Sequence, residues 1–184
     1  MSLAGKFIMN LFFRIIFLLL AAIAIAGCAS PAGKQAMTIS PSDIISNRSE
    51  KLTNAVYVSS VSGGKSTNPL WTSQVDNETF KSALEQSLAI SGYKASDPSK
   101  AKYLVHAELK KLEQPLIGID FDVVSEVSYT VEVGDEKNTY PISANGTATF
   151  SESVIGFERL RIANEKSIKA NIIKFINFLN SKFP

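Results

Sequence analysis

The segment Gly63-Gly64-Lys65-Ser66 has residue types that could do chemistry, because a glycine-rich loop after a strand can cradle phosphate. The β-branched and aromatic residues of 56–61 predict that strand. The phosphate-binding pattern, however, needs a further glycine where Ser59 stands, and a helix that starts at the lysine. Pro69 holds the residue before it out of helical geometry. We therefore predict a connecting loop with no nucleotide ligand, although Trp71 just after it is a candidate partner contact.

His106, the only histidine of the chain, is the second candidate. One histidine cannot form a two-histidine metal site, and no G-x-S-x-G turn for a nucleophilic serine is present. Strand alternation places His106 on a polar face, where Glu108, Glu126 and Glu132 could align as an acid pair. Such alternation is typical of a solvated sheet surface. We therefore expect no enzyme, catalytic residue, metal or cofactor; a hydrolase would need His106 in a cleft beside carboxylates.

Cys28 is the single cysteine, which by itself indicates a reactive thiol or an intermolecular disulfide. Before it, Lys6 and Arg14 are the only charges, and an apolar stretch occupies 15–26. Positive residues, a short apolar core and a small-residue exit are typical of a secretory signal. The uncharged run of about 12 residues is shorter than the roughly 20 that a membrane-spanning helix needs. We therefore predict a cleaved signal rather than a retained anchor.

The sequence Ile25-Ala26-Gly27-Cys28 resembles the lipobox of bacterial lipoproteins. The resemblance implies a signal peptide over 1–27, with Ile25, Ala26 and Gly27 recognised at cleavage. It also implies diacylglycerol on the Cys28 sulfur and an N-acyl chain such as palmitate, and two or more chains anchor a protein stably. Ala29 comes next, where aspartate usually retains enterobacterial lipoproteins in the inner membrane. The resemblance thus favours the outer membrane, facing the periplasm, over the inner membrane.

Charge and size restrict the possible roles of the chain beyond the signal. The chain has 19 basic and 17 acidic residues, and the predicted signal holds two of the basic ones, so the remainder is formally neutral. No strong field remains to attract nucleic acid. About 157 residues are enough for one domain with a hydrophobic core. We predict a lipidated cysteine and flexible tether over 28–53, with a reach of roughly 28 Å, and a single domain over 54–184. Residues 38–45 could instead dock as an extended arm.

Periodicity predicts the elements of the domain. A helix begins near Ser73 or Asp76, either of which could cap it, and ends at Gly92. The other elements are strands over 55–61, 103–109, 121–133 and 139–151, a five-residue hairpin loop over 134–138, and a helix over 157–181. The order β-α-β-β-β-α predicts an α+β fold. We expect a two-layer sandwich with a four-stranded, mostly antiparallel sheet and two helices packed on one face.

The last helix is also strongly basic, and its cations are Arg159, Arg161, Lys166, Lys169, Lys174 and Lys182. A basic amphipathic helix can lie on anionic lipid. Its wide apolar stripe is needed by the sheet, however, so we expect a solvated basic face.

The predicted domain is similar in layout to small uncharacterised bacterial lipoproteins facing the periplasm. The features that carry the resemblance are AVYVSSV, ALEQSLAISGY, the alternating hairpin and RLRIANEKSIKANIIKFINFL. A comparable layout occurs in the lipopolysaccharide-assembly lipoprotein that plugs an outer-membrane barrel, and in auxiliary lipoproteins of transport systems. The resemblance implies a role in the cell envelope but carries over no functional residues.

We therefore expect a non-enzymatic lipoprotein, anchored in the membrane by its lipid, that binds another envelope protein in an accessory or assembly role. The apolar run 116–119 either starts a strand or forms an exposed patch, and Leu116 and Ile117 join Trp71 as candidate partner contacts. The first alternative is a small-ligand, lipid-binding or transport-auxiliary module with an apolar cavity between sheet and helices. A partner-binding protein would have a filled core and an exposed apolar patch. A periplasmic hydrolase is the third alternative.

Overall fold

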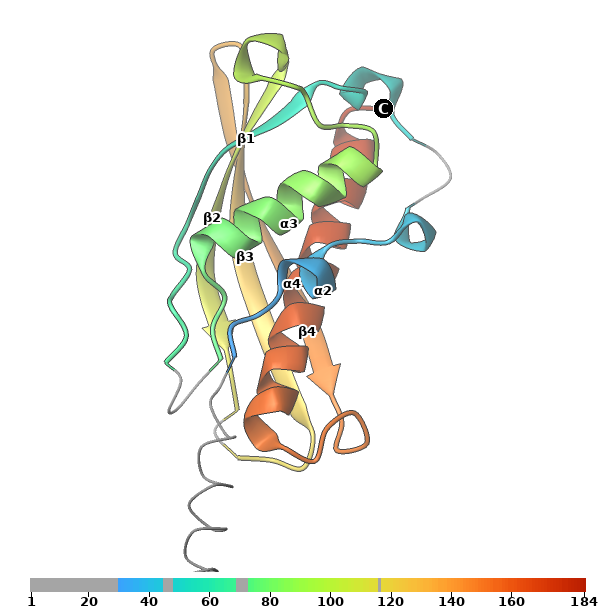
Figure 1. Ribbon diagram of the computed structural model, residues 1–184. Helices are drawn as coiled ribbons and strands as arrows, with labels where there is room; N and C mark the ends of the chain where they lie inside the picture. The colour runs from blue at the N-terminus through green and yellow to red at the C-terminus, as the bar shows by residue number, and fades with distance from the viewer. Residues whose placement is uncertain (1–29, 45–47, 69–72, 116) are drawn as a thin grey trace, which may run out of the picture.

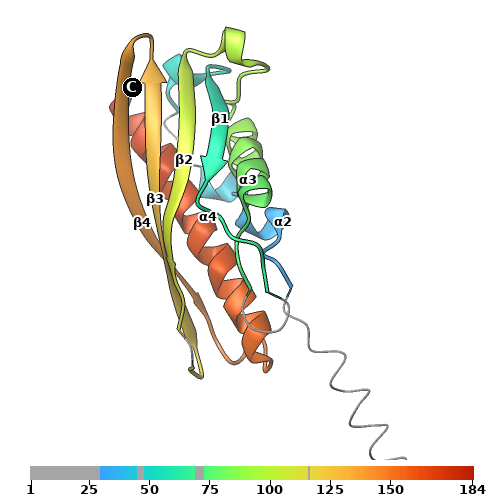
Figure 2. The ribbon, with the colours of Figure 1, turned by 90° about the vertical axis from the view of Figure 1, so that its left-hand side faces the viewer.

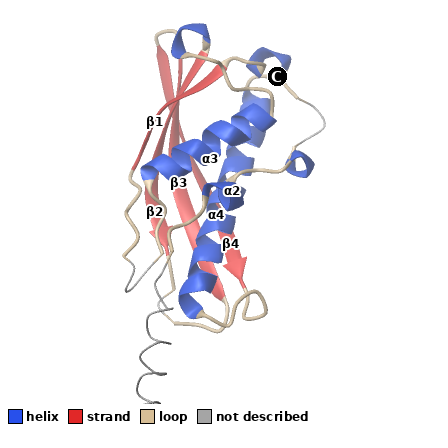
Figure 3. Ribbon diagram, viewed as in Figure 1, coloured by secondary structure: helices blue, strands red, loops and turns tan. Residues whose placement is uncertain are grey.

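The computed structural model describes residues 30–44, 48–68, 73–115 and 117–184 (Figure 3). After the short helix α2, the described helices and strands follow the predicted order β-α-β-β-β-α. The elements are α2 (Lys34–Met37), β1 (Val56–Ser62), α3 (Asn77–Ile90), β2 (Tyr103–Glu113), β3 (Phe121–Val133), β4 (Glu136–Ala148) and α4 (Gly156–Lys182), with 3-10 turns at Pro41–Asp43, Glu50–Leu52 and Pro98–Lys100.

The sheet has the strand order β1-β2-β3-β4. β1 pairs with β2 in parallel, because α3 carries the chain back between them, and the other two pairs are antiparallel. α3 and α4 both lie on one face of this sheet (Figure 2). The predicted α+β two-layer sandwich, with a mostly antiparallel sheet, is confirmed.

The ends of α3 are set by local chemistry that the sequence shows. The Asp76 side chain accepts a hydrogen bond from Thr79 N at 2.8 Å, so Asp76 is the N-cap residue and Ser73 is not. Gly92, just beyond the helix, has a φ of +78°, the left-handed conformation that ends many helices. One buried face of α3, which includes Phe80, Leu84 and Leu88, packs on the sheet.

The β3–β4 hairpin is tighter than predicted. β3 ends at Val133 and β4 begins at Glu136, so the loop has two residues rather than five. Gly134, the first of them, has a φ of +58°, as a type II′ turn requires. At its other end β4 stops at Ala148, before the predicted end at residue 151, and Phe150 lies in the loop beyond it.

The space between the sheet and the helices is filled by side chains. The rings of Tyr129 and Phe175 stack with centroids 3.8 Å apart. The Tyr129 hydroxyl donates to Asn171 Oδ1 at 2.9 Å, and burial raises the pKa of this tyrosine. The Asn171 amide donates in turn to Ile142 O at 2.9 Å. The polar groups inside this layer are thus paired with one another, as burial demands.

The N-terminal segment packs on the domain, so the predicted flexible tether over 28–53 is wrong for its described part. Met37, Ile39 and Leu52 are buried in the main core. α2 packs against both α3 and α4, and the segment that contains it lies across the helical layer (Figure 1). The amino-acid composition of this segment predicted a tether because its few apolar residues lie among many small and polar ones. The alternative of a docked arm agrees with the structure over 38–44.

Polar contacts hold this arm to both long helices. Ile39 N donates to Ser87 Oγ of α3 at 3.2 Å. Asp43 lies 2.9 Å from Lys169 Nζ of α4 and accepts from Ser40 N at 2.7 Å. The hydrogen bond from Lys169, together with smaller effects of those from Ser40, lowers the pKa of Asp43 to about 2. The carboxylate of Asp43 is therefore stabilised in its charged form when the arm is docked.

Replacing Asp43 with asparagine (Asp43→Asn) should lower the free energy of unfolding at neutral pH by about 1 kcal/mol, as expected for a partly exposed ion pair. Because the folded-state pKa of Asp43 is depressed, its contribution is present above its ordinary value of 3.8 and is lost as the pH falls toward 2. Urea unfolding at a series of pH values should show the difference between the two proteins shrinking over that interval. Asp135→Asn, an exposed change in the hairpin loop, should show no such convergence.

The contact between β4 and α4 depends on Gly146, where a Cβ atom would collide with the α4 backbone at Ser167 and Ala163. Gly146→Ala should therefore destabilise the protein by about 2 kcal/mol, the usual cost of overpacking. Asn145→Ala, at the exposed neighbouring position, should change stability by no more than about 0.5 kcal/mol. Thermal unfolding followed by circular dichroism measures both. Equal melting temperatures for the two variants would contradict this account of the helix–sheet contact.

Candidate functional site

Most of the predicted site residues lie outside the described residues. These are the lipid-attachment residue Cys28, the cleavage residues Ile25, Ala26 and Gly27, and the candidate partner contacts Trp71 and Leu116. Ile117 is described, and it lies in the loop between β2 and β3 with 91% of its surface exposed. β3 begins only at Phe121, so the described part of the apolar run before it is exposed and is not the start of the strand.

Exposed apolar side chains gather on two loops at one end of the molecule. One is the β2–β3 loop (residues 114–120) and the other is the β4–α4 loop (residues 149–155), which lie together at the lower end of Figure 1. We name the exposed set the apolar tip: Ile117 (91% exposed), Ile119 (75%), Val154 (71%), Phe150 (51%) and Ile155 (47%). Exposed apolar clusters of this kind mark contact surfaces.

Arg159 joins the two loops of the apolar tip. Its guanidinium donates to Ser153 O at 2.7 Å and to Gly118 O at 3.4 Å. It also lies 5.1 Å from the ring centroid of Phe121 and 5.2 Å from that of Phe150, within the range of cation–π attraction. Arg159 is only 6% exposed, so the predicted solvated position is wrong for this residue. Its head group is buried because both loops close over it.

Most other cations of α4 are also paired within the domain rather than presented as a free basic face. Arg161 pairs with Glu158 and Glu165, Lys166 with Glu152, and Lys169 with Asp43, while Lys174 donates to Ser143 O. The apolar stripe of α4 is meanwhile buried against the sheet. α4 is therefore a core element.

The described chain begins beside the root of the β2–β3 loop. Ser30 O accepts a hydrogen bond from Ser73 Oγ at 2.8 Å. Ser73 is fully buried, and its carbonyl oxygen accepts from Gln114 Nε2 at 2.9 Å and from Asn164 Nδ2 at 3.0 Å. Gln114 directly follows β2, three residues before Ile117. This network fixes the start of the arm to the end of the domain that carries the apolar tip.

A buried carboxylate on α4 adds a second attachment. Gly33 N donates to Glu165 Oε1 at 2.7 Å, and Arg161 pairs with the same oxygen. Arg161 also pairs with Glu158, and this contact lowers the pKa of Glu158 and raises that of Arg161. Because Glu165 is only 4% exposed, loss of these partners would leave a buried charge without compensation.

The glycine-rich loop after β1 does not direct its amides at an open site. Gly64 N donates to Asn77 Oδ1 at 2.7 Å, and Lys65 N donates to Val75 O at 2.9 Å. The next helix starts at Asn77, twelve residues after Lys65. The amides of Gly64 and Lys65 are used to hold the loop against the start of α3.

His106 lies on the face of the sheet opposite the helices, as the alternation predicts. Its Nδ1 atom lies 2.9 Å from Ser60 Oγ, and its Nε2 atom lies 3.0 Å from Glu132 Oε1. In a serine-protease-like triad the carboxylate contacts Nδ1 and the serine contacts Nε2, so these roles are reversed. Lys137 also pairs with Glu132 and is the first cause of its lowered pKa. The arrangement is a cross-strand polar network.

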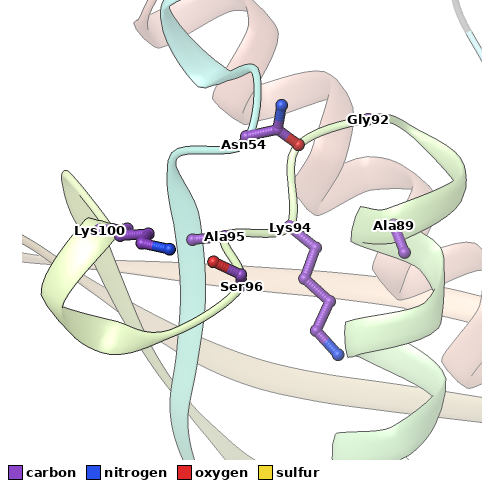
Figure 4. A pocket seen from close by; sticks show the side chains of 7 residues that line it. All are labelled: Asn54, Ala89, Gly92, Lys94, Ala95, Ser96 and Lys100. Carbon is purple, nitrogen blue, oxygen red and sulfur yellow. The ribbon is translucent and has the colours of Figure 1, made fainter.

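A hollow of about 640 Å³ lies near the end of α3 (Figure 4). It is lined by Asn54, Ala89, Gly92, Lys94, Ala95, Ser96 and Lys100. The Lys94 ammonium pairs with Glu85 at 3.1 Å. This open hollow with lysines in its wall differs from the apolar cavity expected of a lipid-binding module.

Within 30–44, 48–68, 73–115 and 117–184, no three His, Cys, Asp or Glu side chains are grouped as metal ligands. Across the same residues, no helix combines the length and apolar character that crossing a bilayer requires.

Three solved structures resemble the fold at low identity. A DUF330-family protein of Xanthomonas campestris is 9% identical, with a TM-score of 0.48 over 69% of this chain and 84% of its own. A Caulobacter crescentus protein proposed to be a lipoprotein is 10% identical, with a TM-score of 0.44 over 73% and 94%. A hypothetical protein of Chlamydia trachomatis is 10% identical, with a TM-score of 0.43 over 70% and 94%. No family model and no curated protein matches the chain. Similarity at this level assigns no function.

Sequence reasoning missed several residues of this end of the molecule. Alternation places Phe150 on the core face of a strand, and it assigns no role to Val154 and Ile155. The adjacent pair Val154-Ile155 between the last strand and the last helix is an available signal, because two neighbouring large apolar residues in a connector seldom both face a core. The burial of Arg159 has no sequence signal, since it depends on two loops that are distant along the chain.

Arg159→Lys should loosen the apolar tip without unfolding the sheet, because an ammonium cannot reach both carbonyls and stack between two rings. Amide hydrogen exchange in 117–121 and 149–156 should become about tenfold faster, while exchange in β1 and β2 stays unchanged. Hydrogen exchange read by mass spectrometry measures both regions at once. Arg48→Lys, the same change at an exposed position, serves as the control. Uniform acceleration over the whole domain would show that Arg159 stabilises the fold as a whole and not the tip.

Proposed function

We propose that this protein is a lipid-anchored, non-enzymatic component of a bacterial cell envelope. The anchor is the lipid on Cys28, the domain faces the periplasm, and the membrane is the outer one. The single observation that carries the proposal is the lipobox Ile25-Ala26-Gly27-Cys28 at the end of a signal-like segment. The hydrogen bond between Ser30 and Ser73 is compatible with it, because it would place a lipid on Cys28 next to the domain.

We further propose that the domain acts by binding another envelope protein rather than a small ligand. The layer between sheet and helices is filled, with Tyr103, Tyr129 and Phe175 each no more than 2% exposed. Apolar side chains are instead exposed on the surface. This combination favours an interaction module over a ligand carrier. Trp71, Leu116 and Ile117 remain candidate contacts.

An enzymatic role is less well supported by the geometry. His106 has both ring nitrogens engaged on the surface of the sheet, one by a serine hydroxyl and one by a carboxylate. Hydrolysis would also need preorganised donors that stabilise a developing negative charge. The amides of the glycine-rich loop at Gly64 and Lys65, which could have served, already donate to other groups.

The proposal predicts that the mature protein begins at Cys28 and carries diacylglycerol and an N-acyl chain. Intact mass spectrometry of the protein purified from bacterial membranes should show loss of 1–27 and the added mass of three acyl chains. Cys28→Ala should abolish both the cleavage and the incorporation of labelled palmitate. Ser30→Ala should leave both unchanged, because the hydrogen bond of Ser30 uses its backbone carbonyl.

An intact leader or a free thiol on Cys28 in the wild-type protein would overturn the proposal. Separation of inner and outer membranes on a density gradient then tests the location. Recovery with the inner membrane would refute the outer-membrane assignment and leave the lipoprotein assignment standing.

A further inference from the structure

We propose that the apolar tip inserts into the surface of the bilayer that holds the Cys28 lipid, so that the domain stands on the membrane in a fixed orientation. The proposal rests on the lipidation of Cys28 proposed above. The occupant of the patch is lipid, at the boundary between head groups and acyl chains, so Ile117 is here a lipid contact and the protein partner binds elsewhere on the domain.

The first argument is the length of chain between the anchor and the domain. Ser30 is held by Ser73, so only Ala29 separates the lipid on Cys28 from a docked position on the domain. The two steps along the chain from Cys28 to Ser30 span at most about 7 Å. A flexible tether over the arm would have a reach of roughly 28 Å. Because the arm is instead folded onto the helices, the anchored end of the domain must lie close to the bilayer.

The second argument is the position of the tip relative to that attachment. Ser73, which holds Ser30, is also bonded to Asn164 of α4, and the helix starts eight residues earlier at Gly156. Eight helical residues correspond to about 12 Å, so the tip lies about 12 Å beyond the level of Ser30. Even if the chain from Ser30 to Cys28 were fully extended toward the bilayer, its roughly 7 Å would leave the tip about 5 Å deeper than the anchored residue. Interfacial protein segments bury their apolar side chains by about 5–10 Å.

The third argument is the polar backbone of the two loops. Unsatisfied amides and carbonyls are costly where water is scarce. In the tip, Arg159 satisfies the carbonyls of Gly118 and Ser153 from inside the domain. Phe150 N donates to Asp120 Oδ1 at 2.9 Å, and Ile155 N pairs with Ser153 Oγ at 3.1 Å. Both loops therefore meet several of their backbone requirements without water while presenting apolar side chains outward.

The charges near the tip indicate whether it would bind the bilayer by apolar insertion or by attraction to anionic head groups. Asp120 and Glu152 lie on the two loops, and the nearby cations Arg159 and Lys166 are already bonded to protein groups. No basic patch is thus presented toward anionic head groups by these residues. Attachment depends on apolar insertion, and it should be insensitive to salt and to the fraction of anionic lipid.

The test uses the full chain, acylated in bacteria and purified from membranes, with a single thiol introduced at one position by Ile117→Cys or Val154→Cys. Both positions are more than 70% exposed, so the fold should tolerate the changes. Acylated Cys28 has no free thiol, and an environment-sensitive nitrobenzoxadiazole label therefore reacts at the new position. The control is Asp135→Cys in the β3–β4 loop. This loop lies at the end of β3 opposite the tip, and β3 has 13 residues and a length of about 43 Å.

The labelled proteins are reconstituted into phosphatidylethanolamine–phosphatidylglycerol vesicles that contain doxyl-labelled lipid. Doxyl quenching should be at least threefold stronger at positions 117 and 154 than at position 135, and quenching by aqueous iodide should show the opposite order. Ile117→Asp combined with Ile119→Asp should bring quenching of a label at position 154 down to the control level, with acylation unchanged.

Equal quenching at both ends of an acylated, membrane-bound protein would overturn the inference and leave the proposed lipoprotein function intact. Iodide protection of the tip in native membranes but not in protein-free vesicles would also overturn it, because the occupant would then be a protein. A protein without lipid on Cys28 would overturn both proposals, and mass spectrometry of the same sample reveals that case.

Discussion

The hydrogen bond between Gly33 and the buried carboxylate of Glu165 sets the position of the arm relative to the two-layer domain. It holds the start of the arm on α4, and Arg161 of the same helix neutralises the carboxylate. The Ser30–Ser73 contact extends this attachment by three residues toward the N-terminus. Without these contacts the arm would be a flexible spacer and the domain could take any orientation. With them, Ser30 and the apolar tip are held at the same end of the domain.

A small, two-layer domain suits a role in which surfaces matter more than cavities. Its core is filled, and polar groups inside it pair with one another in the chain of bonds from Tyr129 through Asn171 to Ile142. What varies around the molecule is the character of its surfaces. The tip is apolar, whereas the outer face of the sheet carries polar cross-strand pairs such as His106 with Glu132. If lipid covers the tip, the outer sheet face and the hairpin end are available to an envelope protein.

The sequence predicted the layers of the fold because they depend on local periodicity. The cap at Asp76, the stop at Gly92 and the buried stripe of α4 could all be read from neighbouring residues. The docked arm could not, because Met37 and Ile39 are isolated apolar residues whose burial depends on helices far along the chain. Arg159 is similar: a cation on a predicted amphipathic helix is normally solvated, and only the closure of two distant loops buries it.

Gly33 and Glu165 lie 132 residues apart along the chain, and if the chain is exported as proposed, this separation affects the order of events during export. In a polypeptide that crosses a membrane from its N-terminus, α4 emerges last, so the part of the docking surface that α4 supplies is missing until translocation is nearly complete. Modifying enzymes working during that interval meet an N-terminal segment that is still undocked. If Cys28 is acylated in that interval, docking of the arm on α4 would follow acylation, so the same segment would be accessible to the enzymes first and packed on the domain afterwards.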